Sequence, residues 1–350
     1  MVRSLPNTQT RLLLLGTGGG PWIISERKGP ASALIVNGAV YQIDCGEGVA
    51  RQMWASGSGS ATQNTFLEAL RAIFLTHLHS DHTVDYFTFF LFGWSNGLAK
   101  VKQPVQIFGP GRRGAMEPIF GSPDLSVATI SPENPTPGTV DMTNALFQAY
   151  ATDINDRMRD YLWPDLRSLV RVHDISIPEG IVTDPNVNPA PSMAPFVVMQ
   201  DENVMVSATL VSHAPIFPAF AFRFDMADGA VVFSGDTCAS PNLIQLAQGA
   251  DILVHEVIDA DWVSARYPLP RTPSQESLLH HLLSAHTSIE EVGKVAETAG
   301  VKTLILNHLV PPDIPKQRWL EAGKNFSGEL IVAEDLMQIV IGNPQSFNER

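Results

Sequence analysis

The chain has 350 residues, of which 44% are hydrophobic and 17% are charged. This composition is typical of a globular protein and excludes an intrinsically disordered one. Its 23 Lys and Arg residues against 36 Asp and Glu residues give a net charge of −13. That balance disfavours non-specific binding to nucleic acid, because phosphates are held chiefly by Lys and Arg. The two cysteines, Cys45 and Cys238, are too few for a disulfide framework.

The sequence contains no apolar run of about 18 residues, so we predict no membrane-spanning segment and no membrane partner. The apolar block at 12–15 is too short for the core of a signal peptide. We therefore expect a cytoplasmic protein, or a periplasmic or secreted one if a leader peptide was removed before residue 1.

Apolar segments alternate with loops along the first 75 residues. The segment 12–15 predicts a strand that runs into the glycine-rich turn 16–21, where the backbone can approach a site closely. The segments 33–36 and 40–43 flank an Asn-Gly pair and predict a hairpin. A further buried strand is predicted at 72–75.

The most informative motif follows that strand and reads His77-Leu78-His79-Ser80-Asp81-His82. Imidazole nitrogen and carboxylate oxygen are ligands that zinc and similar divalent metals prefer. In an extended His-x-His pair both rings project to the same side, because side chains alternate along a strand. His77 and His79 can therefore hold one metal, while Asp81 and His82 face a second.

The next part of the chain changes character. The segment 86–94 is dense in aromatic residues, for which a buried helix face is the commoner explanation and a pocket wall the alternative. A strand is predicted at 105–108. Between 120 and 200 prolines and polar residues are frequent, no clear strand series precedes Val197, and helical spacing predicts one long amphipathic helix near 141–162. We interpret 120–200 as an insertion or cap on an α/β core.

Strands and helices alternate again after residue 203. Strands are predicted at 204–211, 219–224, 230–234, 252–254 and 303–306, and helices at 242–248 and 288–299. Most of these strands lead into a side chain that can bind metal, at His213, Asp236, His255, Glu256 and His308. Because strand ends gather at one edge of a layered α/β fold, we expect these side chains to meet the first histidine motif.

These motifs resemble those of the metallo-β-lactamase fold superfamily. The turn 16–18, Arg27, the loop 44–48, His255-Glu256 and Ala285-His286-Thr287 are similar to its tRNase Z/arylsulfatase-like branch. The resemblance covers about residues 11–110 and 203–310. It implies an α/β fold, a four-layer αββα sandwich, with residues 1–350 as a single domain and 120–200 as a partly helical insertion within it.

The resemblance also implies a dinuclear metal centre. The implied ligands are His77, His79 and His213 for one zinc ion, Asp81, His82 and His308 for the other, and Asp236 bridging the two. Two Zn²⁺ ions would lower the pKa of a shared water molecule, supply a metal-bound hydroxide at neutral pH and stabilise the negative charge that develops on the attacked group. Mn²⁺ and Fe²⁺ are alternative metals.

Three catalytic roles are implied beside the metals. His286, oriented by Glu256, would be the general acid on the leaving oxygen, and Asp81 can also accept the nucleophile's proton. The His-Glu-Ala-Thr element of the branch reads His255-Glu256-Val257-Ile258 here, so only its first half is kept. The remaining histidines, which we leave outside the ligand set, are His173, His255, His280 and His281.

The composition of the insertion determines which substrate we expect. The RNA-processing members of the branch use a basic, glycine-rich arm, whereas the insertion here carries Asp141, Asp153, Asp156, Asp160, Asp165 and Asp174. These carboxylates would repel a phosphate backbone, so nucleic acid is not expected as a partner. We expect hydrolysis of an ester-type bond (sulfate ester, lactone or carboxylic ester) in a small apolar or aromatic molecule. The alternatives are a phosphodiesterase or tRNA 3′-processing endonuclease, and a non-enzymatic metal-binding protein.

Six aromatic side chains are candidates for the wall of a substrate pocket. Core or surface packing is the commoner explanation for each of them. They are Trp22, Phe87, Phe90, Tyr161, Trp163 and Trp262. The long helix and the family resemblance are compatible with a homodimer.

Overall fold

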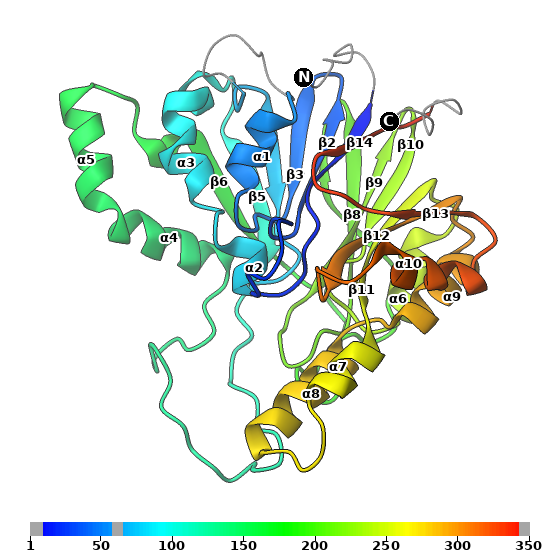
Figure 1. Ribbon diagram of the computed structural model, residues 1–350. Coiled ribbons are helices and arrows are strands. Elements are labelled where there is room, and N and C mark those ends of the chain that lie inside the picture. The colour runs from blue at the N-terminus through cyan, green and yellow to red at the C-terminus, as the bar shows by residue number, and fades with distance from the viewer. Residues whose placement is uncertain (1–9, 58–65, 343–350) are drawn as a thin grey trace.

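The computed structural model describes residues 10–57 and 66–342, which form two seven-stranded sheets. The sheets lie face to face and helices cover their outer faces (Figure 1). The predicted α/β class and the four-layer αββα sandwich are therefore confirmed. In the described part of the chain, every helix is too short or too polar to cross a lipid bilayer.

The first sheet contains the strands of the N-terminal half and one strand from the C-terminal end. These strands are β1 (Arg11–Gly16), β2 (Ala31–Val36), β3 (Ala39–Ile43), β4 (Leu70–Phe74), β5 (Val105–Pro110), β6 (Val170–Ile175) and β14 (Met337–Val340). Their order is β14-β1-β2-β3-β4-β5-β6. Neighbours from β14 to β3 run antiparallel, and neighbours from β3 to β6 run parallel.

The second sheet is built from the C-terminal half. Its strands are β7 (Phe196–Gln200), β8 (Val204–Leu210), β9 (Phe220–Met226), β10 (Gly229–Phe233), β11 (Ile252–Ile258), β12 (Thr303–Val310) and β13 (Glu329–Val332). Their order is β13-β12-β11-β10-β9-β8-β7. The strands from β10 to β13 run parallel, so their C-terminal ends emerge at the same edge of the sheet.

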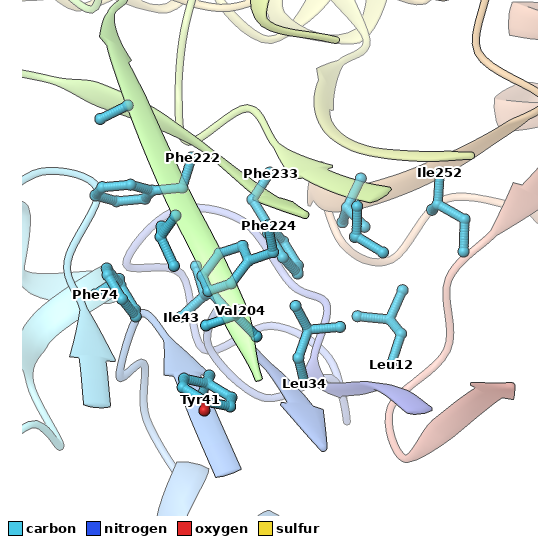
Figure 2. Packing of buried hydrophobic residues seen from close by; sticks show 14 of the residues in the cluster. Leu12, Leu34, Tyr41, Ile43, Phe74, Val204, Phe222, Phe224, Phe233 and Ile252 are labelled. Carbon is cyan, nitrogen blue, oxygen red and sulfur yellow. The ribbon is translucent and has the colours of Figure 1, made fainter. Parts of the chain in front are cut away.

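A hydrophobic layer joins the two sheets, and the alternation of side chains along β9 shows why. Phe220, Phe222 and Phe224 point into this layer, whereas Ala221 between them packs with the helices on the other face. Phe74 at the end of β4 meets Phe222 and Phe224 with ring centroids 5.4 and 5.1 Å apart (Figure 2). Burying a phenylalanine side chain contributes about 1.5–3 kcal/mol. This packing fixes the end of β4 relative to the second sheet.

The helices lie outside the sheets. Their bounds are α1 (Val49–Ala55), α2 (Ser80–Thr83), α3 (Thr88–Leu91), α4 (Thr139–Ala149), α5 (Ala151–Asp160), α6 (Pro241–Ala247), α7 (Ala260–Arg266), α8 (Pro273–Ala285), α9 (Ile289–Ala299) and α10 (Lys316–Trp319), with 3₁₀ turns at Gly93–Asn96, Leu98–Lys100, Leu166–Leu169 and Leu320–Asn325. In Figure 1, α1 and α3 flank the first sheet, α6 and α9 flank the second, and α7 and α8 extend below β11.

The segment 120–200 differs from the prediction in two ways. The single helix expected near 141–162 is two helices, α4 and α5, because Tyr150 leaves helical geometry at φ −100° and ψ 14°. The segment also contains β6, which extends the first sheet by pairing with β5. Apolar side chains of both helices pack on the outer face of the first sheet. Part of the expected insertion therefore belongs to the core.

Candidate metal centre and active site

Metal-capable side chains from both sheets meet where the strands end. His77 and His79 follow β4, His213 follows β8 and Asp236 follows β10. His308 lies inside β12, since β11 and β12 run on to Ile258 and Val310 past a shift of register. His77, His79, His213 and Asp236 therefore follow strands as expected, whereas His308 lies within a strand that is longer than expected.

A first group contains His77, His79, His213 and Asp236, whose ligand atoms all lie within 4.8 Å of one another. His79 Nδ1 is 3.0 Å from His77 Nε2 and 3.1 Å from His213 Nε2. Asp236 Oδ2 is 3.8 Å from the Nε2 atoms of both His77 and His213. Three ring nitrogens and one carboxylate oxygen thus converge on one point.

A second group contains Asp81, His82 and His308, again with ligand atoms within 4.8 Å of one another. Asp81 Oδ2 is 3.7 Å from His82 Nε2 and 3.4 Å from His308 Nε2. Asp236 reaches this group as well, with Oδ1 3.3 Å from His82 and Oδ2 3.1 Å from His308. Asp236 is therefore the side chain that the two groups share.

In three of the histidines the outward-facing ring nitrogen is held by another group, which fixes the direction of the inward-facing one. His77 Nδ1 lies 3.1 Å from Thr76 Oγ1, and His213 Nδ1 lies 2.9 Å from the carbonyl oxygen of Ala285. His82 Nδ1 lies 2.9 Å from Asp44 Oδ2. Histidines that bind metals are oriented in this way by a partner on their second nitrogen.

The inward-facing atoms fit a pair of metal ions. His82 Nε2 and Asp236 Oδ1 are buried, and neither has a hydrogen-bond partner among residues 10–57 and 66–342. Nitrogen and oxygen donors of this kind suit zinc and related divalent metals. The two clusters are consistent with a dinuclear metal site.

Charges inside the cluster shift the pKa values in opposite directions. Burial lowers the pKa of His308, but Asp236 and Asp81 raise it more strongly, and the result is a pKa of about 10. Burial lowers the pKa of His79 to about 4 and holds that of His77 well below its usual range. Burial raises the pKa of Asp81, yet His82 and His308 bring it below its usual range. Asp81 is therefore ionised at neutral pH and available as a ligand.

His286 and Glu256 form a buried pair beside the two groups. His286 Nδ1 is 3.1 Å from Glu256 Oε1, which also accepts hydrogen bonds from the backbone N–H groups of Thr237 and Thr287, both at 3.1 Å. Burial lowers the pKa of His286, but Glu256 raises it above the usual value, so the ring readily carries a proton. The His286 ring stacks at 5.8 Å on that of His308, which places it next to the cluster.

Two polar side chains at the site were not among the predicted site residues. Asp44 hydrogen-bonds His82 and also accepts from the backbone and hydroxyl of Thr76, each at 2.8 Å. Its position after β3, in a carboxylate-bearing loop, was the available signal. His281 on α8 lies near the cluster, with ring centroids 5.5 Å from His213 and 5.9 Å from His79. The residues around His281 carry no motif from which its position at the site could be predicted.

The glycine-rich turn packs directly on the second group. The Gly20 backbone N–H donates to Asp81 Oδ2 at 3.1 Å, and that of Gly19 donates to the carbonyl of Leu309 at 3.1 Å. A Cβ atom on Gly19 would lie 2.5 Å from His308 Nδ1 and 2.6 Å from Val310 Cγ2. Only a residue without a side chain can therefore occupy position 19.

We expect Gly19→Ala to weaken metal binding roughly 10- to 100-fold, the usual effect of disturbing a group that orients a ligand. The added methyl group must displace the His308 ring, because the Leu309 backbone behind it is hydrogen-bonded to this turn. Competition with a fluorescent zinc chelator measures the change. Gly111→Ala is the matched control, since its added Cβ would make contacts of 3.4 Å or longer. Equal metal affinity in both variants would contradict the expectation.

The six candidate pocket aromatics separate into two sets. Phe87 and Phe90 are buried in the core between the first sheet and its helices, and Trp163 packs against the same core. Tyr161 is 55% exposed and contacts Trp163. These four side chains therefore belong to the outer face of the first sheet and not to the metal-capable cluster.

The other two aromatics pack against the C-terminal ends of β11 and β12. Trp22 and Trp262 contact each other with ring centroids 5.5 Å apart, and the Arg266 guanidinium lies 5.9 and 5.3 Å from the two rings. They pack with Ile258 and Val310, each two residues beyond a side chain of the site. Trp22 itself follows Gly20, whose backbone N–H donates to Asp81, by two positions.

Comparisons with known proteins agree with the fold. No family model matches the chain. A ribonuclease Z of Mycobacterium sp. (strain KMS) is 30% identical over 333 residues, which span 94% of this chain and 95% of that protein. The crystal structure of human tRNase Z, short form, aligns with a TM-score of 0.58 and 19% identity over 95% of this chain and 99% of that one. That of the metallo-β-lactamase fold protein YhfI from Bacillus subtilis aligns with a TM-score of 0.57 and 16% identity over 94% and 98%.

The fold and the paired clusters define a metal-dependent hydrolase of the metallo-β-lactamase fold. Within that class, the chain belongs to the ribonuclease Z family.

Membership in this family overturns the expectation that nucleic acid is not a partner. The acidic residues in 120–200 do not exclude an RNA substrate, for a physical reason. Three of those carboxylates are paired with arginines, at Arg112–Asp141, Arg157–Asp153 and Arg167–Asp165, with the closest atoms 2.6, 3.1 and 2.6 Å apart. A paired carboxylate repels a phosphate group much less than a free one. The net charge of the whole chain also says little about one surface.

Proposed function

We propose that this protein is a metal-dependent endonuclease that removes the 3′ extension from tRNA precursors. The observation that carries the proposal is the shared cluster of two metal-capable groups in a chain of the ribonuclease Z family. The 30% identity to a ribonuclease Z over 94% of the chain favours an RNA substrate over a small apolar molecule.

The proposed metals are two zinc ions. The side chains that would hold them are His77, His79 and His213 for one ion, Asp81, His82 and His308 for the other, and Asp236 for both. When bound, two such ions lower the pKa of a water molecule and stabilise the negative charge that develops on the attacked phosphate. The protein contributes rigid ligands, because Thr76, Ala285 and Asp44 hold the outer nitrogens of three of the histidines.

His286 is the proposed general acid. A hydroxide ion attacks phosphorus, the bond between phosphorus and the ribose 3′-oxygen breaks, and His286 gives its proton to that oxygen as it leaves. Glu256 holds the ring in position through Nδ1, which leaves Nε2 for the substrate. Asp81 is the proposed acceptor of the proton that the attacking water loses. The products are a 3′-hydroxyl end and a 5′-phosphate end.

Trp22 and Trp262 are proposed to contact an unpaired base of the RNA near the cleaved bond, since aromatic rings stack on bases of any sequence. We expect Trp262→Ala to raise KM for a tRNA precursor roughly tenfold, the effect of one lost stacking contact, with little change in kcat. Steady-state kinetics measure both constants. Trp54→Ala is the control because Trp54 is 69% exposed on α1. An unchanged KM in the Trp262 variant would refute the contact.

A panel of substrates tests the proposed function. Purified protein is compared on a tRNA precursor, bis(p-nitrophenyl) phosphate, an aryl sulfate, an aryl ester and a lactone, with metal content measured on the same sample. The proposal expects cleavage of the precursor at a rate far above that of the other substrates. Rapid turnover of the sulfate, ester or lactone, with no RNA cleavage, would overturn it.

A further inference from the structure

His281 lies on α8 at the edge of the metal-capable cluster. One ring nitrogen from each of His213, His281 and His286 lies within 4.8 Å of the other two. The ring centroids of His281 and His286 are 6.0 Å apart. The His281 side chain is half-buried, so part of it remains accessible to solvent.

The hydrogen bonding of His281 leaves one nitrogen available. Nδ1 lies 3.2 Å from the carbonyl oxygen of Ala214. A carbonyl oxygen only accepts hydrogen bonds, so Nδ1 carries the hydrogen atom and the neutral ring presents Nε2 as an acceptor. Among residues 10–57 and 66–342, no group forms a hydrogen bond with His281 Nε2.

The neighbours of His281 already have other partners, which argues against a third metal site. His213 Nε2 is 3.1 Å from His79 Nδ1 and so faces the first group. His286 is bonded to Glu256 through Nδ1 and is the proposed proton donor. His281 therefore lies beside the proposed proton donor, near the place where the leaving oxygen of the substrate would lie, with its Nε2 available.

The ribose that carries the leaving oxygen also carries a suitable hydrogen-bond partner for His281 Nε2. The carbon that bears the leaving 3′-oxygen is bonded to the carbon that bears the 2′-hydroxyl, so the two oxygens are neighbours. A hydroxyl group can donate to a ring nitrogen or accept from it. The 2′-hydroxyl is also the group by which a protein distinguishes RNA from DNA at a given position.

We infer that His281 hydrogen-bonds the 2′-hydroxyl of the ribose whose 3′-oxygen leaves, and so selects RNA at the cleaved bond. This inference rests on the proposed function. His286 protonates one oxygen of the ribose while His281 holds its neighbour. His281 is thus a substrate-contacting residue that determines specificity, not a metal ligand.

A double-mutant cycle between protein and RNA tests the inference. One substrate is an all-ribose tRNA precursor, and the other carries a single 2′-deoxyribose immediately 5′ of the cleaved phosphate. Wild-type protein and His281→Ala are compared by single-turnover rate on both. The deoxy substitution also changes the acidity of the leaving oxygen, but this contribution is equal for both proteins and cancels in the cycle.

The matched control is His280→Ala. His280 is the preceding residue on α8, is exposed, and stacks on Phe120 with ring centroids 4.1 Å apart. We expect His281→Ala to reduce the ratio of ribose to deoxyribose rates roughly three- to tenfold, the effect of one neutral hydrogen bond. The His280 variant should keep the wild-type ratio, and both variants should keep the wild-type metal content. His281→Leu, of similar volume and good helix propensity, gives the same readout if the alanine variant fails to fold.

An unchanged ratio in the His281 variants would overturn the inference, as would loss of metal from them. In either case continued RNA cleavage by the wild-type protein would leave the proposed function standing. If the wild-type protein cleaves no RNA at all, the proposed function and this inference both fail.

Discussion

Replacement of Asp236 with alanine should remove metal from both groups and lower hydrolysis by at least about a thousandfold, because the two-metal centre supplies most of the charge stabilisation of the reaction. Asp236 is the carboxylate within 4 Å of His77, His82, His213 and His308. Its removal takes one ligand from each group. It also removes a negative charge that helps to raise the pKa values of His82 and His308.

Metal analysis by mass spectrometry and the rate on a tRNA precursor measure the two effects in the same preparation. We expect two metal ions per chain in the wild-type protein and fewer than one in the variant. Asp261→Ala is the control, because the Asp261 carboxylate is 87% exposed. Full activity with two bound metals in the Asp236 variant would refute the assignment of Asp236 to both groups.

Replacement of His286 with alanine should lower kcat by about 10²- to 10⁴-fold, the range for loss of a general acid, and leave metal content unchanged. The reason is that the ribose 3′-oxygen is a poor leaving group unless it is protonated. With bis(p-nitrophenyl) phosphate the loss should be much smaller, because p-nitrophenolate leaves without a proton. Comparison of the two substrates separates proton donation from a structural defect.

His173→Ala serves as the control for this variant. His173 lies on β6 and hydrogen-bonds Gln106 at 3.0 Å, remote from the cluster. An equal loss on both substrates would show that His286 does not act as the acid. Loss of metal would show that it acts as a ligand.

The metal-capable residues were predictable because their signal is local. A short apolar segment followed directly by histidine or aspartate predicts both a strand and the position of a metal-capable side chain at its end. The strands meet at one edge, since β10 to β13 are parallel and Phe74 packs against Phe222 and Phe224 of the other sheet. The positions of His77, Asp236 and His308 therefore follow from the order of the strands.

Features that depend on distant partners were predicted less well. Aromatic residues suit both a buried helix face and a pocket wall. The sequence around Phe87 and Phe90 therefore does not show that they pack on the outer face of the first sheet. The Arg112–Asp141 pair joins residues 29 positions apart, so the acidic residues were counted as free charges. The Arg157–Asp153 pair, four residues apart on α5, could have been read from helical spacing.

The missed strand and the missed histidine have separate causes. β6 reads Val-Arg-Val-His-Asp-Ile, and its alternation of apolar and polar side chains suits the edge of a sheet. That pattern was obscured by the polar, proline-rich sequence around it. His281 reaches the cluster only because α8 packs beside His213, with its Nδ1 directed at the carbonyl oxygen of Ala214.

Single-turnover cleavage of a 5′-labelled tRNA precursor by the zinc-loaded protein tests the proposed endonuclease activity most directly. We predict one cut at the start of the 3′ extension that leaves a 3′-hydroxyl end. Chelation of the metal or Asp236→Ala should abolish that cut. An intact precursor, after incubation with protein shown to hold two metal ions and to hydrolyse an aryl sulfate or a lactone, would contradict it.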